Sequence, residues 1–190
     1  MIKSVRRRGS DAPKLIAAGA VFIAALSGCT DHNSSDTGLP PKVLPTTLPT
    51  TFDTCHEIPS EIFTERAIDP NPHSEEDLTG GDNIASSEIQ RKGCTYLRRA
   101  EGDGAMGVDV VINVTNDNVD HLKAGLGGVS QYREISIDGH KTGVMQNDTY
   151  CKVLVDIKDG GLNFDMADQG DPCQFLIDLA SAVVPLLPKE

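Results

Sequence analysis

The sequence predicts an α+β fold in which helices pack on one side of a mostly antiparallel sheet. Short segments of alternating apolar and polar residues recur along the chain, as is typical of strands. Two connections between them carry Asp-Gly, a strong signal for a hairpin turn. An amphipathic helical pattern closes the chain. Tryptophan is absent, so Val, Ile and Leu must supply most of the core.

The predicted elements run in the order helix, two strands, helix, four strands and helix. Ser60 stands in a capping position for the first helix, and Pro70 stops it. A loop rich in Pro, Gly, Ser and acidic residues follows. Gly127 and Gly128 end the weaker second helix. By residue number, we expect a helix at 59–68, a loop at 69–92, strands at 94–98 and 108–114, a helix at 116–126, strands at 132–137, 140–146, 150–157 and 162–167, and a helix at 172–187.

The last four strands are predicted to form two hairpins. Asp138-Gly139 makes the first turn and Asp159-Gly160-Gly161 the second. Asp171 is a good N-cap for the final helix, and Pro172 occupies its first helical position. The apolar stripe of this helix consists of Phe175, Leu176, Leu179, Ala180, Val183, Val184 and Leu187.

The first 28 residues are predicted to be a signal peptide. Five basic residues precede an apolar run at 15–26, which is the order of a secretory signal. This run reaches roughly 18 Å as a helix, whereas a bilayer core is roughly 30 Å thick. The tetrapeptide Leu26-Ser27-Gly28-Cys29 resembles the bacterial lipobox. We therefore expect Cys29 to be lipidated, the alternative being an ordinary signal peptide that ends near a buried or disulfide-bonded cysteine.

A tether and one domain are expected after Cys29. Residues 29–51 are rich in Thr, Ser, Pro and Gly, and such a composition favours a disordered, partly polyproline tether. Residues 52–190 have the length of one domain with one core. The mature part carries a net charge of about −15, which argues against nucleic acid or anionic lipid surfaces as partners.

Four cysteines remain once Cys29 is assigned to the lipid, and an even number suits an oxidising compartment. They allow three pairings, among which the sequence cannot choose. We favour Cys55 with Cys94 and Cys151 with Cys173, because each bond would join a helix or its approach to a strand. A zinc site at Cys55 and His56 is the alternative, but no C-x-x-C or H-x-x-x-H spacing supports it, and we expect no metal or other cofactor.

The contexts of these cysteines carry a family resemblance. They are Phe52-Asp53-Thr54-Cys55, Gly93-Cys94-Thr95-Tyr96, the strand from Tyr150, and Asp171-Pro172-Cys173 before the last helix. Together they resemble an uncharacterised family of actinobacterial envelope lipoproteins from mycobacteria and nocardiae. Thr54 stands where that family usually has proline, and Tyr96 where it commonly has tryptophan. The resemblance implies an envelope lipoprotein and supplies no catalytic residues.

We find no linear catalytic motif. The stretch 128–132 begins like a serine-hydrolase elbow around Ser130 but has Tyr132 where glycine is required. The acidic stretches at 69–82 and 165–171 lack the spacing of a calcium loop. The five histidines are scattered; a convergence of His56, Glu57 and His73 would be the first place to look for an enzyme site.

The sequence therefore favours a non-enzymatic binding or accessory module, anchored by lipid on the outer face of the cytoplasmic membrane. An envelope protein, a glycan or a small ligand is the expected partner. A cell-wall hydrolase without a linear motif is the alternative, and a carrier of lipid or another hydrophobic ligand is a third option.

Overall fold

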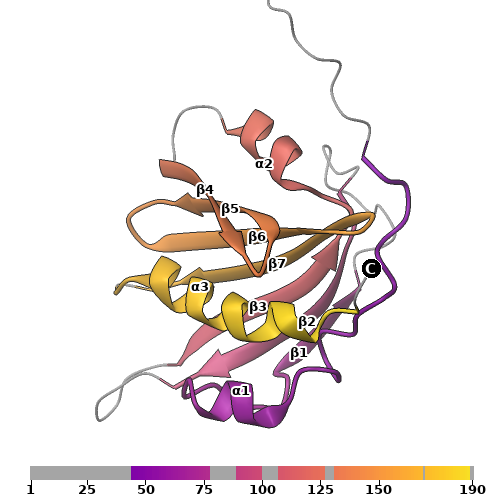
Figure 1. The fold of residues 1–190 in the computed structure, drawn as a ribbon. Coiled ribbons are helices and arrows are strands. Elements are labelled where there is room, and N and C mark those ends of the chain that lie inside the picture. Colours follow the sequence, from indigo (N-terminus) through magenta and orange to yellow (C-terminus); the bar gives the residue numbers. More distant parts are fainter. Residues whose placement is uncertain (1–43, 78–88, 100–106, 127–130, 169, 189–190) are drawn as a thin grey trace, which may run out of the picture. The chain divides into compact units, whose positions relative to one another are not determined.

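The computed structural model describes residues 44–77, 89–99, 107–126, 131–168 and 170–188, so the predicted signal peptide and Cys29 lie outside the described residues. Within these ranges the chain forms a seven-stranded antiparallel sheet with a few helices (Figure 1). The strands are β1 (Ser74–Asp77), β2 (Arg91–Arg98), β3 (Val108–Thr115), β4 (Gln131–Ile137), β5 (His140–Gln146), β6 (Tyr150–Ile157) and β7 (Gly160–Ala167). The helices are α1 (Ser60–Thr64), α2 (Val119–Gly125) and α3 (Pro172–Val183), and the 3-10 turn η1 (Val184–Leu186) follows α3.

The sheet consists of two meanders that meet in its middle. Its strand order is β1-β2-β3-β7-β6-β5-β4, so β7 pairs with β3 on one side and β6 on the other. Phe164 of β7 faces Ile112 of β3 and Val153 of β6 in this register. All six pairings are antiparallel, which agrees with the prediction of a mostly antiparallel sheet, and the β4–β5 and β6–β7 pairs are the two predicted hairpins.

The main core lies between α3 and one face of the sheet. Ile112, Val153 and Phe164 share this face and are fully buried. Helix α3 packs on β6 and β7 through the predicted stripe, of which Leu176, Leu179, Ala180 and Val183 are buried. Asp171 accepts a hydrogen bond from the Gln174 amide, which confirms the predicted N-cap and the proline after it.

Helix α2 lies on the opposite face of the sheet, so the prediction that helices pack on one side only was wrong. Val144 faces Val153 in the main core, and the neighbouring Gly143 therefore faces away from α3. A Cβ on Gly143 would lie 3.3 Å from the Leu122 side chain of α2. The missing side chain at Gly143 leaves the space in which α2 packs.

Other differences concern polar or short elements. Helix α1 is shorter than predicted, and its N-cap is Pro59 with no side-chain cap rather than Ser60. Ala67, with a φ of 57°, turns the chain before Pro70 is reached. Strand β1 lies inside the predicted loop, where its fully exposed residues offer no apolar alternation. Asp138 and Gly139 form the predicted turn with positive φ at both positions.

The second hairpin turn lies one residue earlier than predicted. Lys158 and Asp159 make it, Asp159 has a φ of 63°, and Gly160 already belongs to β7. A Cβ on Gly160 would lie 2.2 Å from the Thr115 carbonyl oxygen. Close packing against β3, rather than turn formation, therefore requires glycine here.

Both favoured disulfides are present. Cys55 bonds to Cys94, which ties the segment before α1 to β2, and Cys151 bonds to Cys173, which ties β6 to α3. The predicted joining of a helix or its approach to a strand is thus confirmed for each bond. No helix in the described part of the chain has the length and apolar character needed to cross a lipid bilayer.

Candidate functional site: a groove beside an ordered strap

Residues 44–51, which the composition assigns to the tether, lie against the folded domain; we call them the strap. Leu44 and Pro49 are buried although the segment is short and polar. Pro49 packs so closely on the second hairpin that a Cβ on Gly160 would lie 2.7 Å from its ring. The folded domain therefore begins before Phe52, because Leu44 and Pro49, two apolar residues of an otherwise polar segment, are buried against it.

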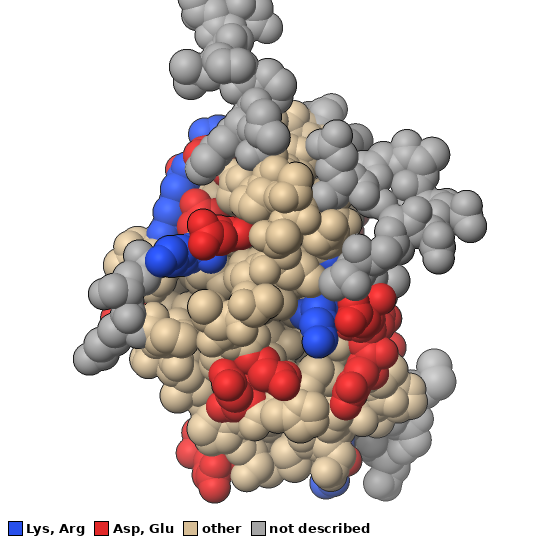
Figure 2. Space-filling view, turned by 90° about the vertical axis from the view of Figure 1, so that its right-hand side faces the viewer, with Lys and Arg blue, Asp and Glu red and all other residues tan. Residues whose placement is uncertain are grey.

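The strap forms one wall of a groove of about 770 Å³. The segment before α1 forms a second wall, and the edge strand β1, its neighbour β2 and the end of β3 form the rest. On this side of the molecule acidic side chains gather in several groups, with few basic ones among them (Figure 2). The lining consists of residues 46–50, Phe52, Asp53, Thr54, Cys55, Glu57, Glu75, Glu76, Asp77, Gln90, Lys92, Gly93 and Val114.

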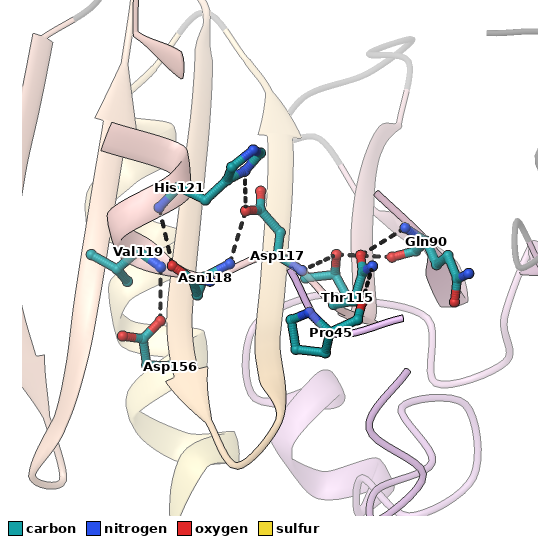
Figure 3. A network of polar contacts seen from close by, with 9 residues as sticks. Pro45, Gln90, Thr115, Asp117, Asn118, Val119, His121 and Asp156 are labelled. Atoms are coloured by element: carbon teal, nitrogen blue, oxygen red, sulfur yellow. Dashed lines mark hydrogen bonds and ion pairs between the residues drawn. The ribbon is translucent and has the colours of Figure 1, made fainter. Parts of the chain in front are cut away.

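Asn116 joins the strap to the residue that precedes β2 (Figure 3). Its side-chain Nδ2 donates to the Pro45 carbonyl at 2.7 Å, and its Oδ1 accepts from the Gln90 amide at 2.8 Å. The Thr115 hydroxyl donates to the Gln90 carbonyl at 2.9 Å. Asn116 is 1% exposed, so these bonds are sheltered from water. They hold two walls of the groove in a fixed relation.

The same network continues into the start of α2 (Figure 3). Asn118 caps the helix by accepting from the His121 amide at 3.0 Å. Asp156 of β6 accepts from the Val119 amide at 2.8 Å. Asp117 lies 2.8 Å from Nδ1 of His121 and also accepts from the Asn118 amide. The three residues between β3 and α2 are thereby fixed between the sheet and the helix.

A compact turn at Asp53 shapes the second wall. The Asp53 carboxylate accepts from the Cys55 amide at 2.8 Å and lies 3.0 Å from Nδ1 of His56. Burial acts to raise the pKa of Asp53, but the hydrogen bonds from Cys55 and His56 outweigh it and hold this pKa below its ordinary value. The hydrogen bond to Asp53 raises the pKa of His56. This carboxylate is occupied with holding the turn.

Tyr96 fixes the same wall from beneath. Its hydroxyl donates to the Thr54 carbonyl at 2.7 Å, and its ring stacks on Phe63 with the centroids 4.3 Å apart. Burial raises the pKa of Tyr96 to about 12, so the phenol stays a neutral hydrogen-bond donor. The Cys55–Cys94 bond lies in the same region and adds a covalent link.

The polar groups left for a ligand lie mainly on β1 and β2. The side chains of Glu75 and Glu76 make no hydrogen bond or salt bridge with any other residue in the described ranges. Lys92 supplies a positive charge in the lining, and the apolar parts come from Phe52 and Val114. This combination can bind an extended polar chain through carboxylates and one ammonium group, with apolar contacts below.

Two smaller hollows lie elsewhere on the domain. One of about 660 Å³ includes Arg98, whose guanidinium lies 4.2 Å from the ring centroid of Phe175 and 3.0 Å from Asp168. The other, of about 360 Å³, is bordered by Tyr150, whose hydroxyl donates to Asp165. Arg98 and Tyr150 contact protein partners, and both hollows are smaller than the groove, which is therefore the better candidate site.

Comparison with known protein families identifies the family of this chain. Residues 24–186 match the family described as Protein of unknown function (DUF3558). The chain belongs to this family. No curated protein and no solved structure matches the chain of this DUF3558 protein.

In this DUF3558 protein the residues named as the first place to look for an enzyme site each contact other parts of the fold. His56 pairs with Asp53 and is exposed, while the Glu57 carboxylate accepts from the Asp53 amide. The His73 amide donates to the Thr95 carbonyl in the approach to β1. Ser130 and part of the acidic loop lie outside the described residues. Across the ranges that the structure covers, no group of three His, Cys, Asp or Glu side chains is arranged to hold a metal ion.

Sequence reasoning missed the strap and the Asn116 network. In the sequence, Asn116 and Asp117 were recognisable only as the start of a weak helix. The side chain of Asn116 is held by hydrogen bonds to Pro45 and Gln90, which lie more than 25 residues away in the sequence. The Leu-Pro pairs at 44–45 and 48–49 were the available signal for the strap, because they repeat apolar anchors inside a polar stretch.

Proposed function

We propose that this DUF3558 protein is a lipid-anchored binding module of the cell envelope. The basic residues at the start of the chain, the apolar run at 15–26 and the lipobox-like tetrapeptide that ends at Cys29 support export and lipidation. Two disulfides agree with a location outside the cytoplasm. The cysteine contexts that resemble actinobacterial lipoproteins support an envelope of that type.

The groove is the proposed binding site, and its construction carries the proposal. Four separate parts of the chain line it, and a buried asparagine links the strap to Gln90. A volume of about 770 Å³ is within the range of sites that bind small molecules or short chain segments. Fixed walls reduce the ordering that binding would otherwise require.

The proposed occupant is an extended envelope polymer, either a peptide or a glycan. Glu75 and Glu76 would accept hydrogen bonds from its amide or hydroxyl groups, and Lys92 would donate. Phe52 and Val114 would contact its apolar parts. No covalent step is needed for this role.

Site-specific photo-cross-linking tests the groove. A photoreactive amino acid at Thr50, which lines the groove, is compared with the same amino acid at Thr64, which is exposed on α1 and does not line it. In intact envelopes we expect a discrete cross-linked product from position 50 only, and we expect E75Q/E76Q to reduce it several-fold. Equal products from both positions, or no effect of the double substitution, would contradict the groove as binding site.

The observations that favour a hydrolase are two carboxylate–imidazole pairs, His121 with Asp117 and His56 with Asp53. A carboxylate that orients an imidazole is a common part of a general base. However, none of the three hollows described above has a histidine in its lining. The binding role therefore accounts for more of the structure.

A further inference from the structure

Strand β1 presents a free edge to the groove. It lies at one end of the strand order and pairs with β2 (Figure 1). Within the described ranges, the backbone of Glu75 and Glu76 makes no hydrogen bond outside that pairing. The strap, which forms another wall of the groove, adds no strand to the sheet. An edge strand offers N–H and C=O groups at regular spacing, and an extended peptide can pair with them.

The charge of the groove lining is one-sided. Among the described residues that line it, five are acidic and one, Lys92, is basic. In the β1–β2 register Lys92 stands opposite Asp77, so its charge offsets one carboxylate. Residues 78–89, which follow β1 in the chain, contain no lysine or arginine. A hollow lined by one sign of charge concentrates ligands of the opposite sign, so charge complementarity favours a cationic occupant.

The register of β1 sets the side-chain spacing that a paired peptide needs. Glu75 lies opposite the buried Cys94 and Asp77 opposite Lys92, so Glu75 and Asp77 share the face of the sheet that carries the core. Residues two apart in a strand are separated by roughly 7 Å, and alternate side chains of a paired peptide repeat at the same distance. A glycan does not repeat backbone N–H and C=O groups at strand spacing, which favours a peptide.

We propose that the groove binds an extended, basic segment of a partner protein, which adds a strand beside β1. The backbone of this segment pairs with the outer edge of β1. Its lysine or arginine side chains at alternate positions contact Glu75 and Asp77, and Glu76 adds to the attraction from the opposite face. The inference rests on the proposed function of the groove and specifies the chemistry of its occupant.

Peptide binding to the intact, disulfide-bonded protein in a neutral detergent tests the proposal. The probe is a fluorescent peptide of about eight residues that alternates lysine with threonine. In one control peptide glutamate replaces every lysine, and in another the threonine backbone nitrogens are methylated, which removes their N–H donors. An unlabelled oligomer of glucosamine, used as a competitor, represents a cationic glycan. Fluorescence anisotropy measures each dissociation constant.

We expect only the unmodified lysine–threonine peptide to bind, and more weakly as the salt concentration rises from about 50 to about 300 mM. E75Q/E76Q should raise its dissociation constant about fivefold. K92Q keeps a hydrogen-bond donor but removes a positive charge, so it should lower the constant about twofold. The matched control E61Q/E65Q removes two charges at exposed positions outside the groove lining and should change the constant by less than about twofold.

Equal binding of the N-methylated peptide or of the glucosamine oligomer would overturn strand addition beside β1. No binding of the lysine–threonine peptide, or equal effects of E75Q/E76Q and E61Q/E65Q, would overturn the proposal as a whole. A discrete cross-linked product from position 50 in envelopes, together with no peptide binding, would leave the groove as the site of a different ligand. Absence of both would contradict the groove itself, so the two failures are distinguishable.

Discussion

Lys152 is a charged residue in an apolar position. It lies on the sheet face opposite α3, beside Asp165 in the register, and is 8% exposed. Burial lowers the pKa of Lys152, and the repulsion from Arg91 acts in the same direction, while Asp165 opposes them. The ammonium has no hydrogen bond to another residue among those described, and the nearby Asn163 Oδ1 is buried without a partner. The Lys152 ammonium and Asn163 Oδ1, on the same face of the sheet, therefore both lack a hydrogen-bond partner among the described residues.

Replacing Lys152 with methionine should stabilise the domain at neutral pH. The change removes a poorly solvated amine and keeps most of the side-chain volume, so we expect the free energy of unfolding to rise by about 1 kcal/mol. Urea unfolding at pH 7 measures this. K158M, at an exposed turn position, is the control and should change stability by less than about 0.5 kcal/mol.

The pH dependence should change in the same variant. The pKa of Lys152 is lower in the folded than in the unfolded protein, so between those two values the unfolded chain binds the extra proton. Native stability should therefore rise with pH towards the ordinary lysine value relative to K152M. Parallel stability curves for the two proteins over pH 7–10 would show that the amine is solvated in the fold.

Helix α3 is the element on which the main core depends. Leu179 is fully buried against the sheet, whereas Leu186 in the following turn is 38% exposed. We expect L179A to lower the free energy of unfolding by about 2–5 kcal/mol, because it leaves a cavity. L186A should lower it by less than about 1 kcal/mol. Similar losses in the two variants, measured in urea, would mean that α3 does not pack as described.

Each disulfide should stabilise the element that it ties to the sheet. The sequence separations are 39 for Cys55–Cys94 and 22 for Cys151–Cys173, which corresponds to about 4 and about 3 kcal/mol in the chain-entropy description. Paired alanine variants and denaturant unfolding measure these losses. Thiol labelling of the denatured, unreduced mature domain should be negligible, and strong labelling would contradict both bonds.

Elements with a clear apolar pattern were predictable from sequence. Strand β6 is rich in Val, Leu and Ile and is bounded by turns, and α3 has an N-cap, a proline and an apolar stripe. Both elements lie within a few residues of their expected ranges. The disulfide pairing was predicted on the basis that each bond joins a helix, or the segment before it, to a strand. The side of the sheet taken by α2 was not predictable, because Val119 and Leu122 fit either face until Gly143 shows where space remains.

The candidate site was less predictable than the fold. Strand β1 has four exposed residues in the order Ser-Glu-Glu-Asp, and such a strand exists only because β2 offers it backbone partners. The strap likewise has a linker composition, and its docking depends on Asn116 and Gly160 far along the chain. Patterns within a short window cannot report partners supplied by distant segments.

At the scale of the whole molecule, we expect one lipidated cysteine to determine the location of the protein. C29A should move the protein from the membrane fraction to the soluble fraction or leave the signal uncleaved, since two or three acyl chains at about 0.8 kcal/mol per buried methylene would be lost. Detergent partitioning and mass spectrometry of the mature N-terminus measure this. A C29A protein that is still processed and still partitions into detergent would exclude the lipid anchor.

The position of β7 determines when the sheet can be completed during synthesis. Each meander contains one end of its own disulfide, and the two halves of the sheet pair with each other through β3 and β7. Because the chain emerges from its N-terminus, β3 is available about 45 residues before β7 begins, an interval of roughly 2–9 s at ordinary elongation rates. During that time β3 has an unpaired apolar edge, the kind of surface that promotes aggregation. A nascent chain halted near residue 158 should therefore be the species that most needs a chaperone.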